Sequence, residues 1–210
     1  MERRGDHQSL HNQTPRILIE FLEVAINSIV FLKGLYPPGA FERRRYMNIV
    51  VQRARHPQLS DYIHSAVAGL QPFIQKGLVE RVAVIFYNKE HIPAERFVFK
   101  LSVNLSYGSK VEETGLEFAL RSFLIKLSVA EPLTKALPHD CSWEITAYVR
   151  SLPEEGNKET QLWIPTDTKQ WQQPPLITPI KSMSSEPLCV QLYLEHPSQS
   201  EPTVPVGNDE

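Results

Sequence analysis

The sequence lacks the residue patterns through which most enzymes work. It has no Walker-type phosphate loop, no H-E-x-x-H metal motif, no G-x-S-x-G nucleophile and no dinucleotide-binding glycine fingerprint. Its two cysteines, Cys141 and Cys189, are too few for a disulfide scaffold or a cysteine-built zinc site, and they fit a reducing compartment. We therefore expect a protein that is not an enzyme and that uses neither a metal ion nor another cofactor.

A cluster of arginines has the chemistry to bind anions. Arg43, Arg44 and Arg45 are consecutive, and Arg53 and Arg55 follow closely. Guanidinium groups attract phosphates and carboxylates, so this cluster could contact DNA or an acidic partner. A solvated hairpin or loop is the other interpretation, and the sequence leaves both open.

Aromatic side chains are the second group suited to binding. Trp163 lies in a polar, proline-rich stretch, where it either pins that stretch to the body or forms a wall of a peptide groove. Tyr62 falls on the apolar face of a predicted helix, where core packing is the simpler interpretation. Gln191 and Tyr193 alternate with apolar residues, which indicates a strand face that is either solvated or a contact surface.

Three helices are predicted before residue 150 to position these groups. The first covers residues 17–36 and is apolar almost all round, so it should be a central helix that the PPG sequence at 37–39 ends. The second begins near residue 57 and stops at Gly77. The third follows the capping-box sequence SKVE at 109–112.

Strands are predicted between and after these helices. The β-rich stretches 81–87 and 94–101, joined by the sequence NKEH, have the pattern of a hairpin. Alternation predicts half-buried strands at 141–150 and 188–195, the latter with its even-numbered apolar residues facing the core. The order helix, helix, hairpin, helix, strand, proline-rich segment, strand indicates an α+β fold, with an antiparallel sheet and helices on one face.

The composition changes near residue 150. Residues 1–150 carry a net charge of +4, whereas residues 151–210 carry −6 and hold 9 of the 17 prolines. Because proline lacks a backbone donor, we expect this last part to be an extended, irregular wrap with short strands. The overall charge of −2 argues against a basic nucleic-acid-coating protein, and no apolar run reaches the length of a membrane span.

Several runs together resemble the HORMA-domain family and, within it, the non-catalytic accessory subunits of DNA polymerase zeta. They are FLEVAINSIVFLKGLYPPGAFERRR, HPQLSDYI, VERVAVIFYNKEHIPAERFVFKL, LRSFLIKLSV, IKSM and VQLYLE, in that order. The resemblance implies a HORMA fold at 14–195, with three main helices on an antiparallel sheet. Residues 14–150 would form its core, residues 151–195 a safety belt that closes over a bound peptide, and residues 196–210 a disordered tail.

The resemblance also implies three contact sites. Tyr62 and Trp163 would line the peptide groove. Gln191, Tyr193 and an apolar residue that falls on Leu176 or its neighbour Ile177 would bind a second partner, and we take Leu176. The third helix would supply the face of a HORMA–HORMA dimer through Arg121 and Lys126, although Pro132 departs from the family pattern there. Arg121 also follows Glu117 by four residues, the spacing of a weak helical ion pair.

The partners that the resemblance implies are proteins. The trapped peptide would come from the catalytic subunit of DNA polymerase zeta, and the second surface would bind the C-terminal domain of a Y-family scaffold polymerase. An AAA+ remodeller could open the belt. We expect no sequence-specific nucleic acid and no membrane as partners, and the nucleus as the main location, with the cytoplasm second. The alternative is a spindle-checkpoint HORMA protein that traps peptides of checkpoint partners.

Overall fold

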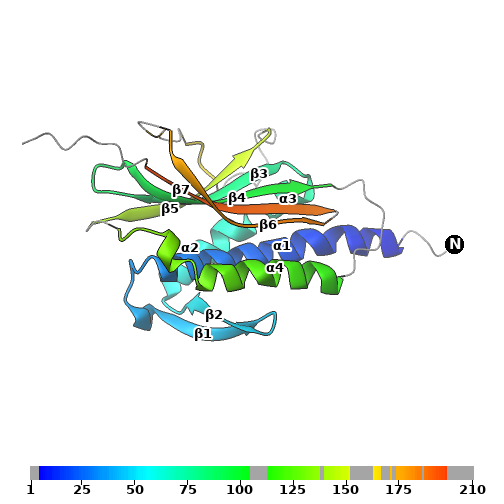
Figure 1. The fold of residues 1–210 in the computed structure, drawn as a ribbon. Helices are drawn as coiled ribbons and strands as arrows, with labels where there is room; N and C mark the ends of the chain where they lie inside the picture. The colour runs from blue at the N-terminus through cyan, green and yellow to red at the C-terminus, as the bar shows by residue number, and fades with distance from the viewer. Residues whose placement is uncertain are drawn as a thin grey trace, which may run out of the picture.

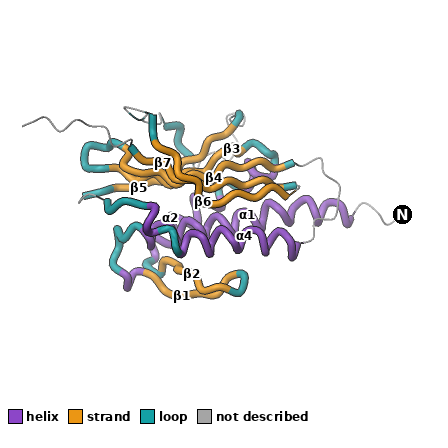
Figure 2. The backbone as a smooth tube through the Cα atoms, in the orientation of Figure 1, coloured by secondary structure: helices purple, strands orange, loops and turns teal. Residues whose placement is uncertain are grey.

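The computed structural model arranges the chain in layers (Figures 1 and 2). A five-stranded antiparallel sheet lies over a layer of helices, and a separate two-stranded hairpin lies beyond the helices. The predicted α+β class, with helices on one sheet face, is confirmed. The structure describes residues 5–104, 113–137, 140–151, 163–166, 171, 174–185 and 187–197.

Helix α1 (Gly5–Leu32) is the central element. Seven of its side chains are fully buried, and α2, α3, α4 and the hairpin all contact it. The central helix is therefore confirmed, but its predicted end at residue 36 is wrong. The helix stops at Leu32 because Gly34 adopts a left-handed backbone (φ +64°), which glycine tolerates without steric strain. The buried side chains are Leu18, Phe21, Leu22, Ala25, Ile26, Ile29 and Val30.

The predicted second helix is divided into α2 (Pro57–Ala68) and α3 (Gln71–Gln75). Pro72 explains the break, because its ring would clash with the carbonyl four residues earlier in a continuous helix. Gly77, at φ +66°, ends the region as predicted. The third helix, α4 (Glu113–Ser128), is confirmed, but the capping box at 109–112 lies outside the described residues.

The sheet has the strand order β5-β3-β4-β7-β6. The predicted hairpin of β3 (Val79–Tyr87) and β4 (Pro93–Val103) is confirmed, as are β5 (Ser142–Val149) and β7 (Leu188–His196). The expectation of only short strands after residue 150 is wrong, because β6 (Leu176–Ser185) has ten residues. It tolerates Pro179 because it is an edge strand and because its register shifts there.

A second hairpin was not in the predicted order. Strands β1 (Phe41–Tyr46) and β2 (Ile49–Ala54) form an antiparallel pair, and the arginine-rich sequence lies within them. Met47 and Asn48 form the two-residue turn with positive φ angles of 46° and 60°, the geometry that matches the twist of a tight hairpin. The arginine cluster therefore lies on a folded hairpin.

The two sheet faces are packed differently. On the helix side, a large core includes an edge-to-face aromatic group of Phe21, Phe99 and Phe123. The outer face has a small cluster of four buried residues, against which Tyr148 and Tyr193 pack. At one end of the core, the buried ammonium of Lys33 pairs with the buried carboxylate of Glu95 and also donates to the Lys135 carbonyl (2.6 Å). The four outer-face residues are Ala83, Ile85, Tyr87 and Val98.

Two findings bear on the class of protein. Among the residues that the structure describes, no helix is both long enough and apolar enough to cross a membrane. Within the same ranges, no group of three or more histidine, cysteine, aspartate or glutamate side chains could hold a metal ion.

Candidate peptide-binding site

The outer edge of β5 is the candidate site. One side of β5 pairs with β3, and within the described part of the chain no strand pairs with its other side. The Ile145 backbone N–H points to that open side, where it donates to the Tyr62 hydroxyl oxygen of α2 (3.1 Å). Because backbone groups alternate along an antiparallel strand, those of Trp143 and Ala147 face the same open side. No described strand therefore pairs with the outward backbone groups of this edge.

Tyr62 lies beside this edge and not in the core. It is 43% exposed, and its ring meets that of Trp143 edge to face at 5.3 Å between centroids. The Trp143 indole N–H in turn donates to the Tyr36 hydroxyl (2.9 Å). Partial burial raises the pKa of the Tyr62 hydroxyl, so it stays protonated and can donate as well as accept.

Trp163 packs against the end of α2. A Cβ atom placed on Gly69 would lie only 2.9 Å from the Trp163 Nε1, so a larger residue would force the indole to shift. Tyr62 and Gly69 are seven residues apart, which places them two turns apart on the same side of the helix. The structure thus places Tyr62 and Trp163, far apart in sequence, on the same side of α2. The Trp163 indole N–H is buried and has no hydrogen-bond partner among the described residues.

Trp171 is a contact residue that the sequence reasoning missed. Its indole N–H donates to Glu195 of β7 (3.2 Å), and the Arg96 guanidinium of β4 lies over its ring at 4.8 Å. Arg96 also pairs with Glu195 (3.6 Å), and both charged side chains are largely buried. These contacts fix the chain to the sheet shortly before β6. The sequence feature that could have indicated this contact is a tryptophan within an acidic, proline-rich stretch.

The outward direction of Gln191 and Tyr193 is confirmed. The even-numbered apolar residues of β7 are buried, whereas Gln191 is exposed and Tyr193 is half-buried on the outer face. Ile177 pairs with Glu195 and shares this face, but Leu176 pairs with His196 and so lies on the opposite face. Ile177 is 60% exposed, so the geometry favours it over Leu176.

Helix α4 presents an exposed apolar stripe. Phe118 and Ile125 of α4 are 72% and 46% exposed, and Val129, just beyond its end, is 63% exposed. The spacing of the three residues puts them on one side of the helix. Arg121 and Lys126 flank this stripe by the same geometry. Arg121 is half-buried, and the structure records no ion pair between it and Glu117 within the described helix.

The chain is thus an α+β domain in which a sheet edge that no described strand covers lies beside Tyr62 and the nearby Trp163. A model of the HORMA domain matches residues 16–164, and the chain belongs to the HORMA-domain family. It is 65% identical over 203 residues to the DNA polymerase zeta processivity subunit of Arabidopsis thaliana, covering 96% of this chain and 94% of that one. It is also 35% identical to the mitotic spindle assembly checkpoint protein MAD2B of Danio rerio, covering 87% and 90%.

Solved structures show the same fold. A chain of the mitotic checkpoint complex superposes with a TM-score of 0.75 at 16% identity, covering 88% of this chain and 99% of that one. The structure of C. elegans HTP-2 bound to the HIM-3 closure motif gives 0.69 at 8% identity, covering 89% and 91%. A processivity subunit is an accessory component, which agrees with the expectation that this chain is not an enzyme.

Proposed function

We propose that the protein is the accessory subunit of a DNA polymerase zeta and that it captures a peptide of the catalytic subunit at the β5 edge. The observation that carries this proposal is the open edge beside Tyr62 and Trp163. The naming of the Arabidopsis relative supports the choice of polymerase. The HTP-2 structure, which contains a bound motif, supports capture of a peptide.

The peptide would add to β5 as a further strand. In this mode the main chain supplies the affinity through strand hydrogen bonds, and side-chain pockets supply the specificity. A peptide carbonyl would take over the Ile145 N–H from the Tyr62 hydroxyl. Trp163 would contact the peptide from the side of the segment that follows β5, and a peptide acceptor could satisfy its indole N–H.

The segment after β5 would act as the belt. It leaves the sheet at one edge and rejoins it as β6, at the opposite edge. Two tryptophans fix this segment to the domain. Trp163 packs against the end of α2, and Trp171 bonds to Glu195 on the outer face of the sheet. Strand β7 holds the end of the belt through eight residue pairs with β4. Release of a trapped peptide would require some of these contacts to open, a step that suits an AAA+ remodeller.

Two further contacts belong to the proposal. The outer face of β7 and β6, with Gln191 and Tyr193 of β7 and Ile177 of β6, would bind the C-terminal domain of a Y-family scaffold polymerase during tolerance of DNA damage. The stripe on α4, flanked by Arg121 and Lys126, would form a HORMA–HORMA dimer. Such a subunit would act in the nucleus.

Calorimetry with overlapping peptides of the catalytic subunit tests the capture. Truncation of an aromatic anchor at an interface typically costs about 2–4 kcal/mol. Trp163→Ala should therefore weaken binding by roughly 30-fold or more. Phe118→Ala, which removes an exposed ring on α4, is the matched control and should leave the affinity unchanged. Equal affinity of folded Trp163→Ala and wild type would refute the groove.

Capture of checkpoint peptides is the second candidate, because the Danio rerio relative is named for the spindle checkpoint. Both functions would use the same edge, so the two kinds of peptide should compete. Stronger binding of checkpoint peptides than of polymerase peptides would favour this second candidate.

A further inference from the structure

The hairpin of β1 and β2 carries the strongest concentration of positive charge in the described structure. Residues 41–55 contain five arginines and one acidic residue, a net charge of +4 in a chain whose total is −2. All five arginines are exposed. The hairpin lies on the far side of the helices from the five-stranded sheet (Figure 1), so it is remote from the β5 edge and from the outer face of β7.

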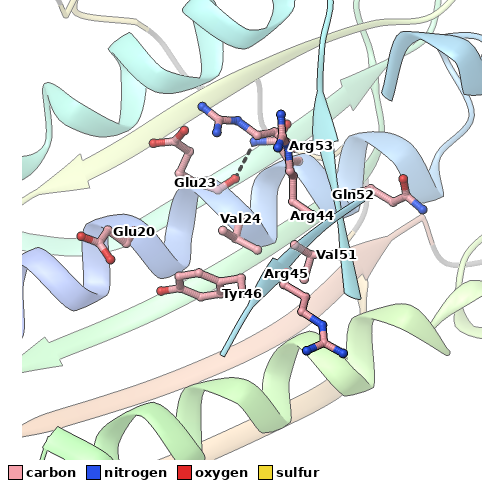
Figure 3. Close-up of a pocket in the computed structure, with 10 residues that line it drawn as sticks. Glu20, Glu23, Val24, Arg44, Arg45, Tyr46, Val51, Gln52 and Arg53 are labelled. Carbon is pink, nitrogen blue, oxygen red and sulfur yellow. Dashed lines mark hydrogen bonds between the residues drawn. The ribbon is translucent and has the colours of Figure 1, made fainter. Parts of the chain in front are cut away.

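The arginines divide between the two faces of the hairpin. Arg44 bonds to Glu42 (2.7 Å) and, with Arg53, lines an open pocket of about 200 Å³ that Glu20 and Glu23 of α1 also line (Figure 3). Arg45 and Gln52 contribute to the lining of the same pocket. Positive charge on this face is therefore partly balanced by nearby carboxylates. Arg45 extends in a different direction from Arg44 in the same view.

The other face of the hairpin holds the buried Phe41 and Ala54 at its base. Its turn end, formed by Arg43, Arg45, Val50 and Gln52, is called here the outer hairpin face. Its pairs are Arg43 with Gln52 and Arg45 with Val50. Within the described residues, neither arginine forms an ion pair with a carboxylate. Val50 is 61% exposed and both arginines are exposed, so the turn end of this face is open to solvent. Two exposed guanidinium groups without an ion pair among the described residues thus project from a two-stranded ribbon.

We propose that the outer hairpin face is a sequence-independent contact for the phosphate backbone of duplex DNA. Residues two apart on a strand are about 6.7 Å apart, which equals the axial rise of about two nucleotides in one DNA strand. Arg43 and Arg45 can therefore reach phosphates of the same strand. Guanidinium groups bind phosphate oxygens in pairs of parallel hydrogen bonds. Among its described residues the face offers one exposed apolar side chain, so it suits a uniform polyanion better than an acidic peptide that also needs apolar contacts.

This inference does not depend on the capture of a peptide, and its test uses none. Fluorescence anisotropy of a labelled duplex should be measured with the full chain at salt concentrations between about 0.03 and 0.2 M. Each phosphate contact contributes about −0.9 to the slope of log K against log salt. Arg43→Gln combined with Arg45→Gln should therefore make the slope about 1.8 less steep and weaken binding more than about tenfold at 0.05 M salt.

The matched control removes the same charge elsewhere. Arg16 and Arg150 are exposed and lie on other elements, where they pair with Glu20 and Glu80. Arg16→Gln combined with Arg150→Gln should keep the wild-type slope and change the affinity by less than about twofold. Both double variants should keep the wild-type melting temperature.

Three results would overturn the proposal. The first is an equal loss in both double variants, which would indicate general charge attraction. The second is an unchanged slope in the hairpin variant. The third is binding of a labelled polyglutamate peptide through Arg43 and Arg45 when the duplex does not bind, which would assign the face to an acidic protein.

Discussion

Replacement of Tyr62 by phenylalanine tests how the β5 edge works. The change keeps the ring and its edge-to-face contact with Trp143 but removes the hydroxyl oxygen that accepts the Ile145 N–H. In the free protein the Ile145 amide then loses its hydrogen bond to residue 62. In a peptide complex a peptide carbonyl would accept the hydrogen bond from the same amide. The substitution should therefore hardly change the stability of the complex.

The magnitude follows from one neutral hydrogen bond at a partly exposed site. Such a bond contributes a net 0.5–1.5 kcal/mol or so to stability. Tyr62→Phe should therefore lower the free energy of unfolding of the free protein by about this amount. Because the substitution destabilises the free protein but not the complex, the affinity for the peptide should rise by roughly two- to tenfold. Loss of an aromatic hydroxyl would thus strengthen binding.

The assay combines calorimetry with amide hydrogen exchange. Exchange at Ile145 should be faster in the free variant than in the free wild type, and equally slow in both complexes. Tyr36→Phe is the matched control, because it removes a hydroxyl that accepts a hydrogen bond from the Trp143 side chain and not from the strand edge. It should reduce stability to a similar degree and leave the peptide affinity unchanged.

A tenfold weaker affinity of Tyr62→Phe would refute this reasoning. The hydroxyl would then bond directly to the peptide, and the Ile145 amide would not be the group for which hydroxyl and peptide compete.

Three other predictions concern separate parts of the molecule. Arg121→Ala should shift any dimer toward monomer in sedimentation while the melting temperature stays close to that of the wild type. Gln191→Ala combined with Tyr193→Ala should abolish pull-down of the scaffold polymerase's C-terminal domain but not of the captured peptide; loss of both, or of neither, would count against a separate surface. Glu95→Gln leaves the Lys33 ammonium buried without its counter-charge, so the free energy of unfolding in denaturant should fall by about 3–5 kcal/mol.

Elements with a strong local period could be predicted from the sequence. The all-round apolar pattern of α1 and the alternation of β7 each follow from burial on known faces, and both are confirmed. The end of α1 was missed because the PPG sequence is a more prominent stop than Gly34, although the glycine alone supplies the left-handed residue.

Elements that depend on partners were missed. Strands β1 and β6 have little alternation, because charged residues fill the first and Pro179 interrupts the second. Both are strands because a neighbouring strand pairs with them. The same holds for the site: the bond from Ile145 to Tyr62 and the contact of Trp163 with Gly69 join residues more than 80 positions apart, so no local pattern could reveal them. The family resemblance named Tyr62 and Trp163, and only the structure supplies their geometry and their contacts with Ile145 and Gly69.

The open edge of β5 also affects how the free protein behaves at high concentration. An unpaired, largely apolar strand edge can pair with the same edge of another copy, which leads to aggregation. Proline and a register shift protect β6 at the other edge, but the β5 sequence SWEITAYV has neither proline nor lysine, and Glu144 is its only charge. A captured peptide would cover the edge. The soluble amount of this protein in a cell should therefore follow the supply of its partner, and surplus chains should be the first to aggregate.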